Sequence, residues 1–300
     1  MSVHPSAEPS PTSPSGATVH ELPQRPGPFF GVTPTGPRVT IKDLAAAKAA
    51  GVIWPMITAY DALTARVFDD AGMPVILVGD SAAMVVYGYD STIPVTVDEL
   101  LPLVRGVSRG ATRSLIVGDL PFGSYQASPS QALETAARFM KEGGAHAVKV
   151  EGGASVLPQV EAMVAAGIPV MGHLGLTPQS VNQFGGYRVQ GRGEAGNVLL
   201  RDAKALESAG AFAIVLEVVP ADLAREVTAS LSIPTIGIGA GAGCDAQVLV
   251  WQDLTGLTPG RPAKFVRQYA DLTGVLTDAV SAWGTDVVSG AYPSPENSYN

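Results

Sequence analysis

Ionisable side chains recur where short apolar runs of the sequence end. The runs over residues 75–78 and 115–117 both lead into Val-Gly-Asp, and three later runs also carry charged or titratable residues at their ends. Polar residues that follow parallel strands meet at one mouth of a barrel and form its active site there. The residues at these ends are Asp80 and Ser81, Asp119, Lys149 and Glu151, His173, and Glu217.

Three of these residues are hard oxygen donors with no soft ligand beside them: Asp80, Asp119 and Glu151. Mg²⁺ prefers such donors and typically takes one or two carboxylates together with water and substrate oxygens. A metal held in this way is a Lewis acid that polarises a carbonyl group. We therefore expect a magnesium site formed by these three carboxylates.

The remaining residues suggest enolate chemistry on a small keto acid. Lys149 would place positive charge where an enolate oxygen develops, and Glu217 lies on a later strand, free to act as a general base. Alternatives remain open at single positions. An Asp after a strand can be a helix N-cap, Lys149 and Glu151 can form an internal ion pair, and His173 can be a substrate contact or a packed core residue.

Short apolar runs of strand length alternate with helical patterns from about residue 39 onward. Capping signals start several helices, such as Thr96 with Glu99 and Ser128 with Pro129. We expect strands over residues 52–58, 75–78, 115–117, 147–150, 170–171, 213–216, 235–238 and 248–250. We expect helices over about 62–71, 96–110, 128–141, 156–165, 201–209, 222–229 and 262–270, with further helical turns after residue 274.

Eight strands alternating with helices predict a (β/α)8 TIM barrel. Its irregular point lies at residues 239–247, which are too few for a crossover helix, so one outer helix must be degenerate. A doubly wound open sheet is the alternative fold, although no glycine-rich dinucleotide loop follows the first strand. The Gly-rich stretch after the seventh strand fits close backbone packing better than phosphate binding.

The composition limits the classes of protein that this chain can be. It has 300 residues, 46% of them hydrophobic, and a net charge of −8, so a sizeable core is expected and nucleic acid is disfavoured as a partner. No apolar run approaches the length of a membrane span. The chain has a single cysteine, Cys244, which excludes an intramolecular disulfide. We expect Cys244 to be a buried packing residue and His146 to have a structural role.

The chain divides into two parts by composition. Residues 1–37 are rich in Pro, Ser and Thr and predict a disordered tail without a secretory signal. Residues 38–300 predict a single catalytic barrel that ends in a helical extension, which could reach a neighbouring subunit. We expect a cytoplasmic protein.

The strand-end motifs resemble the ketopantoate hydroxymethyltransferase family from about Thr40 to Ser298. The matching motifs follow one another in order along the chain. They are Ile57-Thr-Ala-Tyr-Asp61, Leu77-Val-Gly-Asp-Ser81, Gly118-Asp-Leu-Pro-Phe122, Val148-Lys-Val-Glu-Gly-Gly153, Gly172-His-Leu-Gly-Leu-Thr-Pro-Gln-Ser-Val181, Gly185-Gly-Tyr-Arg-Val-Gln-Gly191, Leu216-Glu-Val-Val-Pro220 and Ile236-Gly-Ile-Gly-Ala-Gly241.

This resemblance implies a barrel of the phosphoenolpyruvate/pyruvate type. It implies transfer of a hydroxymethyl group from 5,10-methylenetetrahydrofolate to 3-methyl-2-oxobutanoate, giving ketopantoate for pantothenate synthesis. It also implies a homodecamer. By motif, Asp80 and Asp119 would bind Mg²⁺ directly and Glu151 would complete the metal site. Glu217 would be the catalytic base or proton shuttle.

The same resemblance implies the substrate contacts. Asp80, Ser81, Asp119 and Lys149 would surround the keto acid, and His173 would touch the product. The chain departs from the family pattern at Ala246 and Asn297. A Mg²⁺-dependent carbon–carbon lyase on the same barrel, of the isocitrate-lyase-like group, is the alternative function, and a non-catalytic binding barrel is a weaker one.

Overall fold

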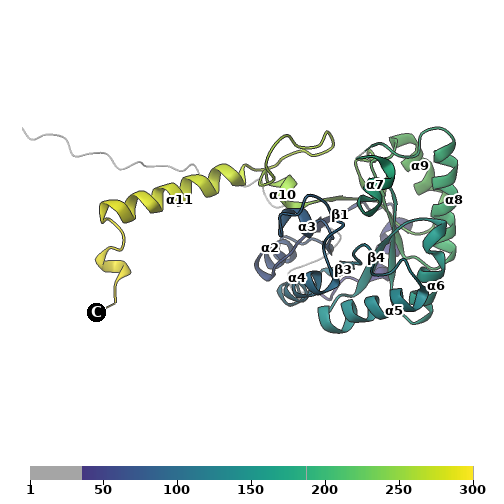
Figure 1. The fold of residues 1–300 in the computed structure, drawn as a ribbon, viewed down its shortest axis with the longest axis horizontal. Coiled ribbons are helices and arrows are strands. Elements are labelled where there is room, and N and C mark those ends of the chain that lie inside the picture. Colours follow the sequence, from purple (N-terminus) through teal and green to yellow (C-terminus); the bar gives the residue numbers. More distant parts are fainter. Residues whose placement is uncertain (1–35, 187, 300) are drawn as a thin grey trace, which may run out of the picture.

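A closed barrel of eight parallel strands forms the centre of the molecule (Figure 1). The structure is a computed structural model that describes residues 36–186 and 188–299. Each strand pairs with the next along the chain, and the last pairs with the first. The strands are β1 (Trp54–Thr58), β2 (Val75–Val78), β3 (Leu115–Asp119), β4 (Ala147–Glu151), β5 (Val170–Gly175), β6 (Ala213–Glu217), β7 (Thr235–Ile238) and β8 (Ala246–Leu249).

Helices surround this barrel and connect its strands. A π-helix (Phe139–Gly143) continues the fifth helix, and 3-10 turns cover Ala154–Val156, Pro178–Ser180 and Pro295–Asn297. The α-helices of the described residues are α1 (Ile41–Ala49), α2 (Ala62–Asp70), α3 (Ala82–Val85), α4 (Val97–Gly110), α5 (Pro129–Arg138), α6 (Leu157–Ala165), α7 (Val181–Phe184), α8 (Glu194–Ser208), α9 (Ala221–Ser230), α10 (Trp251–Leu254) and α11 (Leu272–Ser289).

Side chains alternate between the two faces of each strand and so form two separate apolar cores. One core lies between strands and helices, and the other fills the barrel. Because side chains alternate between the faces of a strand, residues two positions further along point into the same space. The interior core includes Val117, Ala147, Met171 and Val215. Two residues after each of them stand Asp119, Lys149, His173 and Glu217, so the barrel interior changes from apolar to charged toward the carboxyl ends of the strands.

The structure confirms the predicted barrel and its irregular point. No helix lies between β7 and β8, where the chain crosses in a glycine-rich loop. A Cβ on Gly241 would lie 2.5 Å from the Cβ of Ala221, which agrees with the close-packing interpretation of this loop. The capping signals at Thr96 and Ser128 start α4 and α5 as expected.

The predicted helix over residues 262–270 is wrong. This segment is an irregular loop that crosses the barrel mouth. Its backbone forms a hydrogen bond with the end of α10, because the N–H of Tyr269 donates to the carbonyl of Leu254 at 2.8 Å. The side chain of Phe265 lies against Gly239. Contacts with the barrel therefore replace the helical hydrogen bonds that the local pattern favoured.

The C-terminal helix α11 leaves the barrel and projects away from it (Figure 1). It is longer than the few turns that the sequence predicted, and none of its residues is buried. Most of the predicted tail, residues 1–37, lies outside the described residues. No helix in the described part of the chain has the length and apolar character to cross a membrane.

A buried carboxylate, Asp69, fastens the end of α2 to the segment before β3. It accepts hydrogen bonds from the backbone N–H groups of Thr112 (3.0 Å), Arg113 (3.1 Å) and Ser114 (2.8 Å). The Arg113 guanidinium lies 3.4 Å away. Burial raises the pKa of Asp69, but these hydrogen bonds lower it more, so the pKa is lowered overall. The ionised form therefore stabilises the fold.

Replacing Asp69 with Asn should reduce the free energy of unfolding by about 2–4 kcal/mol at neutral pH, because it removes the charge facing Arg113 and one acceptor oxygen of buried N–H groups. Since the folded pKa is the lower one, the wild-type advantage is full above the unfolded pKa of about 4 and shrinks as the pH falls below it. Urea unfolding at pH 7 and at about pH 3, at equal protein concentration, measures both effects.

Asp70→Asn is the matched control for this prediction. The neighbouring carboxylate is 65% exposed and lies 3.7 Å from Arg113, so its loss should cost less than about 1 kcal/mol. Equal losses in the two variants would contradict the role assigned to Asp69.

Candidate active site

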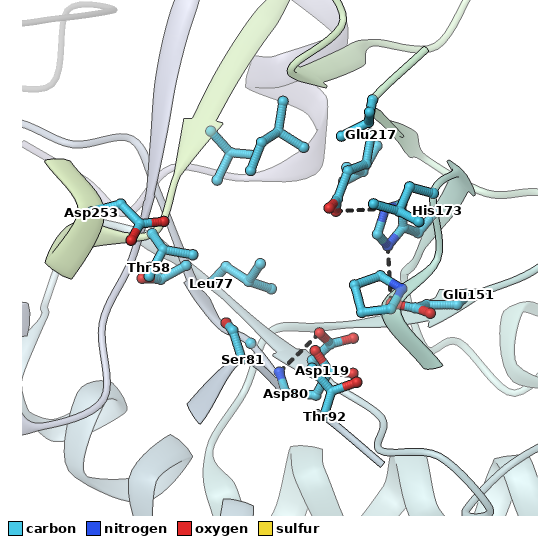
Figure 2. A pocket seen from close by; sticks show the side chains of 18 of the residues that line it. Thr58, Leu77, Asp80, Ser81, Thr92, Asp119, Glu151, His173, Glu217 and Asp253 are labelled. Carbon is cyan, nitrogen blue, oxygen red and sulfur yellow. Dashed lines mark hydrogen bonds and ion pairs between the residues drawn. The ribbon is translucent and has the colours of Figure 1, made fainter. Parts of the chain in front are cut away.

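A cavity of about 500 Å³ opens at the carboxyl ends of the barrel strands. Figure 2 shows its polar side chains converging from different strands. All seven residues singled out in the sequence line this one cavity: Asp80, Ser81, Asp119, Lys149, Glu151, His173 and Glu217. Asp119, Lys149, Glu151, His173 and Glu217 lie on the strands themselves, and Asp80 follows β2 directly. The structure thus brings together every predicted site residue.

Lys149 is the cation at the centre of the charged cluster. Its Nζ lies 2.9 Å from Oδ1 of Asp119 and 3.7 Å from Oε1 of Glu151, and all three side chains are almost fully buried. Burial lowers the pKa of Lys149, but Asp119, Glu151 and Asp80 raise it more, so the net shift is upward. Lys149 is therefore a permanent positive charge in a water-poor site, and not a proton acceptor near neutral pH.

His173 connects two carboxylates from different strands. Its Nδ1 lies 3.2 Å from Oε1 of Glu151 on β4, and its Nε2 lies 3.3 Å from Oε2 of Glu217 on β6. Burial and Lys149 lower the pKa of His173, but the contacts with Glu151 and Glu217 raise it to about 9. The two carboxylates thus favour the protonated ring, while Nζ of Lys149, 3.2 Å from the same Nδ1, opposes it. The contact with Nε2 holds Glu217 at the edge of the cavity.

Asp80 and Ser81 form the opposite part of the charged wall. The backbone N–H of Asp80 donates to Oδ2 of Asp119 at 3.1 Å, so the two carboxylates lie close together. Burial, followed by the charges of Asp119 and Glu151, raises the pKa of Asp80 well above its usual value. The hydroxyl of Ser81 lies 2.8 Å from that of Tyr60 and also lines the cavity.

These carboxylates fit a divalent cation. When Asp80, Asp119, Glu151 and Glu217 are ionised, the four carboxylates outnumber Lys149 and protonated His173 by two charges. Among the described residues, no three His, Cys, Asp or Glu side chains form a ready-made metal cage. Mg²⁺ does not need such a cage, because it requires only one or two carboxylates and takes its other ligands from water and substrate.

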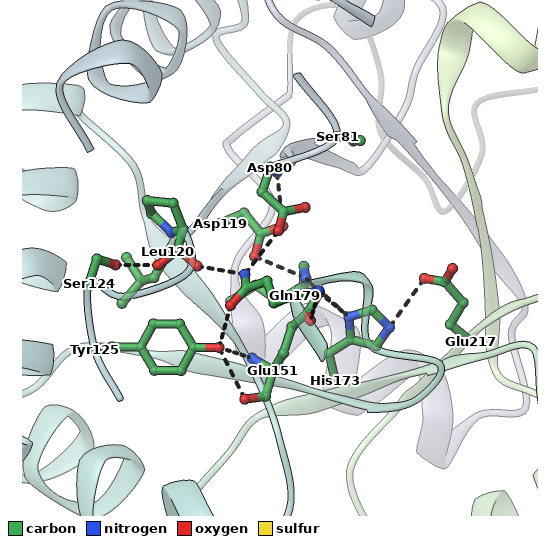
Figure 3. Close-up of polar contacts among 12 residues, drawn as sticks. Asp80, Ser81, Asp119, Leu120, Ser124, Tyr125, Glu151, His173, Gln179 and Glu217 are labelled. Carbon is green, nitrogen blue, oxygen red and sulfur yellow. Dashed lines mark hydrogen bonds and ion pairs between the residues drawn. The ribbon is translucent and has the colours of Figure 1, made fainter. Parts of the chain in front are cut away.

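Gln179 ties the carboxylates to the surrounding structure (Figure 3). Its Nε2 donates to Oδ2 of Asp80 at 2.9 Å and to the carbonyl of Leu120 at 3.0 Å, and its backbone N–H donates to Oε2 of Glu151 at 3.0 Å. Its Oε1 accepts from the hydroxyl of Tyr125 at 2.8 Å. Both the nitrogen and the oxygen of the Gln179 side-chain amide have hydrogen-bonding partners, so the orientation of the amide is fixed.

The sequence reasoning did not single out Gln179 or Tyr125. Tyr125 is fully buried, and its hydroxyl also accepts from the backbone N–H of Glu151 at 3.0 Å. Neutral side chains carry no charge signature, and Tyr125 lies between β3 and α5, far in sequence from the charged end of β4 at residues 149–151. The one available signal for Gln179 was its position just after the end of β5.

Apolar side chains and one strained residue complete the wall. Leu77, Val215, Val218 and Ile238 line the cavity beside the charged groups. Val218 has φ +49°, in the left-handed region that a β-branched residue rarely adopts. Its N–H donates to the carbonyl of Ile238 at 2.8 Å, which holds the residue after Glu217 in this conformation.

Two residues that the sequence set aside lie outside the cavity. His146 accepts a hydrogen bond at Nδ1 from the backbone N–H of Ile116 at 2.9 Å. Burial, and next the charge of Arg38, lower its pKa to about 4. Cys244 is buried, and burial raises its pKa. Both features agree with structural roles.

Comparisons with known proteins identify the family. Residues 38–295 match the ketopantoate hydroxymethyltransferase family. The 3-methyl-2-oxobutanoate hydroxymethyltransferase of Frankia casuarinae is 65% identical over 266 residues, covering 89% of this chain and 90% of that protein. The protein of the same name from Thermobifida fusca is 66% identical over 263 residues, covering 87% of this chain and 94% of its own.

Solved structures of similar shape support the barrel type. Phosphonopyruvate hydrolase, solved with oxalate and Mg²⁺, has a TM-score of 0.56 and 13% identity, covering 86% of this chain and 93% of its own. A 2,3-dimethylmalate lyase of the phosphoenolpyruvate mutase/isocitrate lyase superfamily has a TM-score of 0.54 and 17% identity, covering 85% and 92%. At such identities these structures show the fold alone. The identity and coverage of the named relatives decide the family, and the chain belongs to the ketopantoate hydroxymethyltransferases.

Proposed function

We propose that this enzyme transfers a hydroxymethyl group from 5,10-methylenetetrahydrofolate to 3-methyl-2-oxobutanoate. The product is ketopantoate, and the reaction is the first step of pantothenate biosynthesis. Family membership supports this reaction. The observation that carries its chemistry is the placement of Glu217 and His173 in the same cavity as Asp80, Asp119 and Lys149.

In this proposal Asp80 and Asp119 bind Mg²⁺ directly and Glu151 completes the metal site. When bound, the ion supplies Lewis acidity that draws electrons from the ketone of the keto acid. Lys149 adds a fixed positive charge beside Asp119, at 2.9 Å, where negative charge develops on the ketone oxygen. Ser81 donates its hydroxyl to the keto acid, and His173 contacts the product.

Glu217 removes the proton from C3 of the keto acid. The electrons of the broken C–H bond form the enolate, and its C3 then bonds to the methylene carbon of the folate. Both carbon–nitrogen bonds that join the methylene carbon to N5 and N10 of the folate break, and a water molecule supplies the hydroxyl group. The two nitrogens take up the proton removed from C3 and one proton from this water. His173 holds Glu217 aimed at the cavity through their 3.3 Å contact. Because Lys149 stays protonated, it cannot replace Glu217 as the base.

The partner of the proposed homo-oligomer is a second copy of this chain that covers α11. This helix carries apolar side chains that face solvent, among them Val280 at 64% and Trp283 at 56% exposure. On the barrel, Leu63 and Val67 of α2 are likewise 78% and 63% exposed. Burying both surfaces between copies would remove apolar area from water.

Proton exchange at C3 of 3-methyl-2-oxobutanoate in D₂O, without folate, tests the catalytic roles. Wild-type enzyme should exchange this proton only with Mg²⁺. Glu217→Gln should slow the exchange at least about 100-fold because it removes the base, and Asp119→Ala should abolish the response to Mg²⁺. Proton NMR of the C3 signal follows the reaction.

The control for this experiment is Glu226→Gln, which changes an exposed carboxylate on α9 and should leave the exchange unchanged. If wild-type enzyme fails to exchange even with tetrahydrofolate present, the proposed substrate is wrong. Full exchange in Glu217→Gln would mean that another group is the base.

Gln179→Leu should weaken Mg²⁺ binding about 10- to 100-fold, because Asp80 and Glu151 lose the donors that orient them. Electron paramagnetic resonance with Mn²⁺ as the probe measures the affinity, and thermal unfolding reports folding separately. Gln190→Leu is the control, since that amide donates within its own loop, to the carbonyl of Arg188. Wild-type metal affinity in Gln179→Leu would contradict the positioning role.

Trp283→Glu should lower the oligomeric state, because it puts a charge into the surface that a second copy covers. Sedimentation velocity at several protein concentrations measures this change. Asp278→Glu, which keeps the charge of another residue on α11, should leave the assembly unchanged. An unaltered assembly in Trp283→Glu would show that the copies meet elsewhere.

A further inference from the structure

The cavity is larger than the keto acid requires. A water molecule occupies about 30 Å³ in the liquid, so eight separate waters fill about 240 Å³. The eight bonded non-hydrogen atoms of the keto acid pack more closely and fill less than this. The cavity measures about 500 Å³. The remaining space is bounded by residues to which the reaction on the keto acid gives no role, on α10 and on the loop that follows it.

Two of these residues are charged groups without a partner in the described part of the chain. The carboxylate of Asp253, on α10, makes no hydrogen bond or ion pair with any described residue, and neither does the ammonium of Lys264. Both line the cavity. Figure 2 shows Asp253 beside Thr58, across the cavity from Glu217 and His173.

An aromatic side chain adjoins Lys264 and is held in place by a glycine. Phe265 lines the cavity and is 37% exposed. It packs so closely on Gly239 that a Cβ at that position would come within 2.9 Å of its ring. Gly239 also has φ +64°, which glycine adopts without strain. The ring is thus supported from behind, while part of it remains accessible from the cavity.

We propose that Asp253, Phe265 and Lys264 form the binding subsite for the folate one-carbon donor. The carboxylate of Asp253 accepts hydrogen bonds from the amino group and ring N–H of the pterin. The pterin stacks on Phe265, and Lys264 faces the negatively charged glutamate tail outside the mouth. Each of the three side chains thus matches one chemical part of the ligand.

The position of this subsite suits the proposed reaction, on which the inference rests. β8 and α10 lie across the barrel from β4, which carries Lys149 and Glu151. A pterin held at Asp253 therefore reaches the keto acid from the side opposite the charged cluster. The methylene carbon enters between them, in a cavity that both substrates share.

Calorimetry with tetrahydrofolate, in the presence of Mg²⁺ and keto acid, tests the subsite. Asp253→Asn should weaken binding about 10- to 100-fold, because a charged acceptor is lost. Phe265→Leu should weaken it about 5-fold or more through lost stacking. Lys264→Gln should weaken it only about 3-fold, and this effect should vanish at high salt because the group is exposed.

Two fragments of the ligand separate the roles of these residues. Asp253→Asn should impair binding of 6-methyltetrahydropterin and not of p-aminobenzoylglutamate, and Lys264→Gln should do the reverse. In steady-state assays the KM for the folate should rise while the KM for the keto acid changes less than about 2-fold. Lys42→Gln, an exposed residue of α1, is the matched control.

The outcomes distinguish this inference from the proposed function. If wild-type enzyme binds tetrahydrofolate and all three variants bind it within 2-fold of wild type, the subsite lies elsewhere and the inference is overturned while the function stands. If wild-type enzyme binds no tetrahydrofolate under any of these conditions, both are overturned.

Discussion

The structure depends on burying an excess of negative charge around one lysine. Asp119, Glu151 and Lys149 are nearly inaccessible to water, and Asp80 joins them. Buried carboxylates this close together raise one another's pKa and oppose folding. Lys149, His173 and the amide of Gln179 offset part of this repulsion. The negative charge that remains is what suits the cluster to the proposed divalent cation.

A barrel can hold such a cluster because its strands fix the direction of every side chain. The barrel interior below the site is apolar and packed, so the charged side chains cannot move further into the barrel. On the outer side, the hydroxyl of Tyr125 accepts a hydrogen bond from the backbone N–H of Glu151, and Gln179 donates one to the carboxylate of Asp80. The positions of the site residues therefore follow from strand register and from a few neutral hydrogen-bonding partners.

The sequence was sufficient to predict the barrel and to identify seven of the charged or polar residues that line its cavity. The reason is that parallel strands leave a plain pattern: apolar runs mark the strands, and charged residues such as Asp119 and Glu217 mark their ends. The sequence failed at residues 262–270, where a helix-like pattern is overridden by contacts with the mouth of the barrel. It also missed Gln179, whose importance comes from hydrogen bonds with Asp80, Leu120, Tyr125 and Glu151, all far from it in the sequence.

The missing helix between β7 and β8 has a consequence for mutational tolerance. In the glycine-rich loop that replaces it, Gly239 lies against Phe265 and Gly241 against Ala221. One of these glycines touches the mouth of the barrel and the other touches the outer helix α9. A side chain added at Gly239 or Gly241 would displace either the rim of the cavity or the outer helix α9. Close steric contacts therefore restrict substitution in this loop as strictly as chemistry restricts it in the active site.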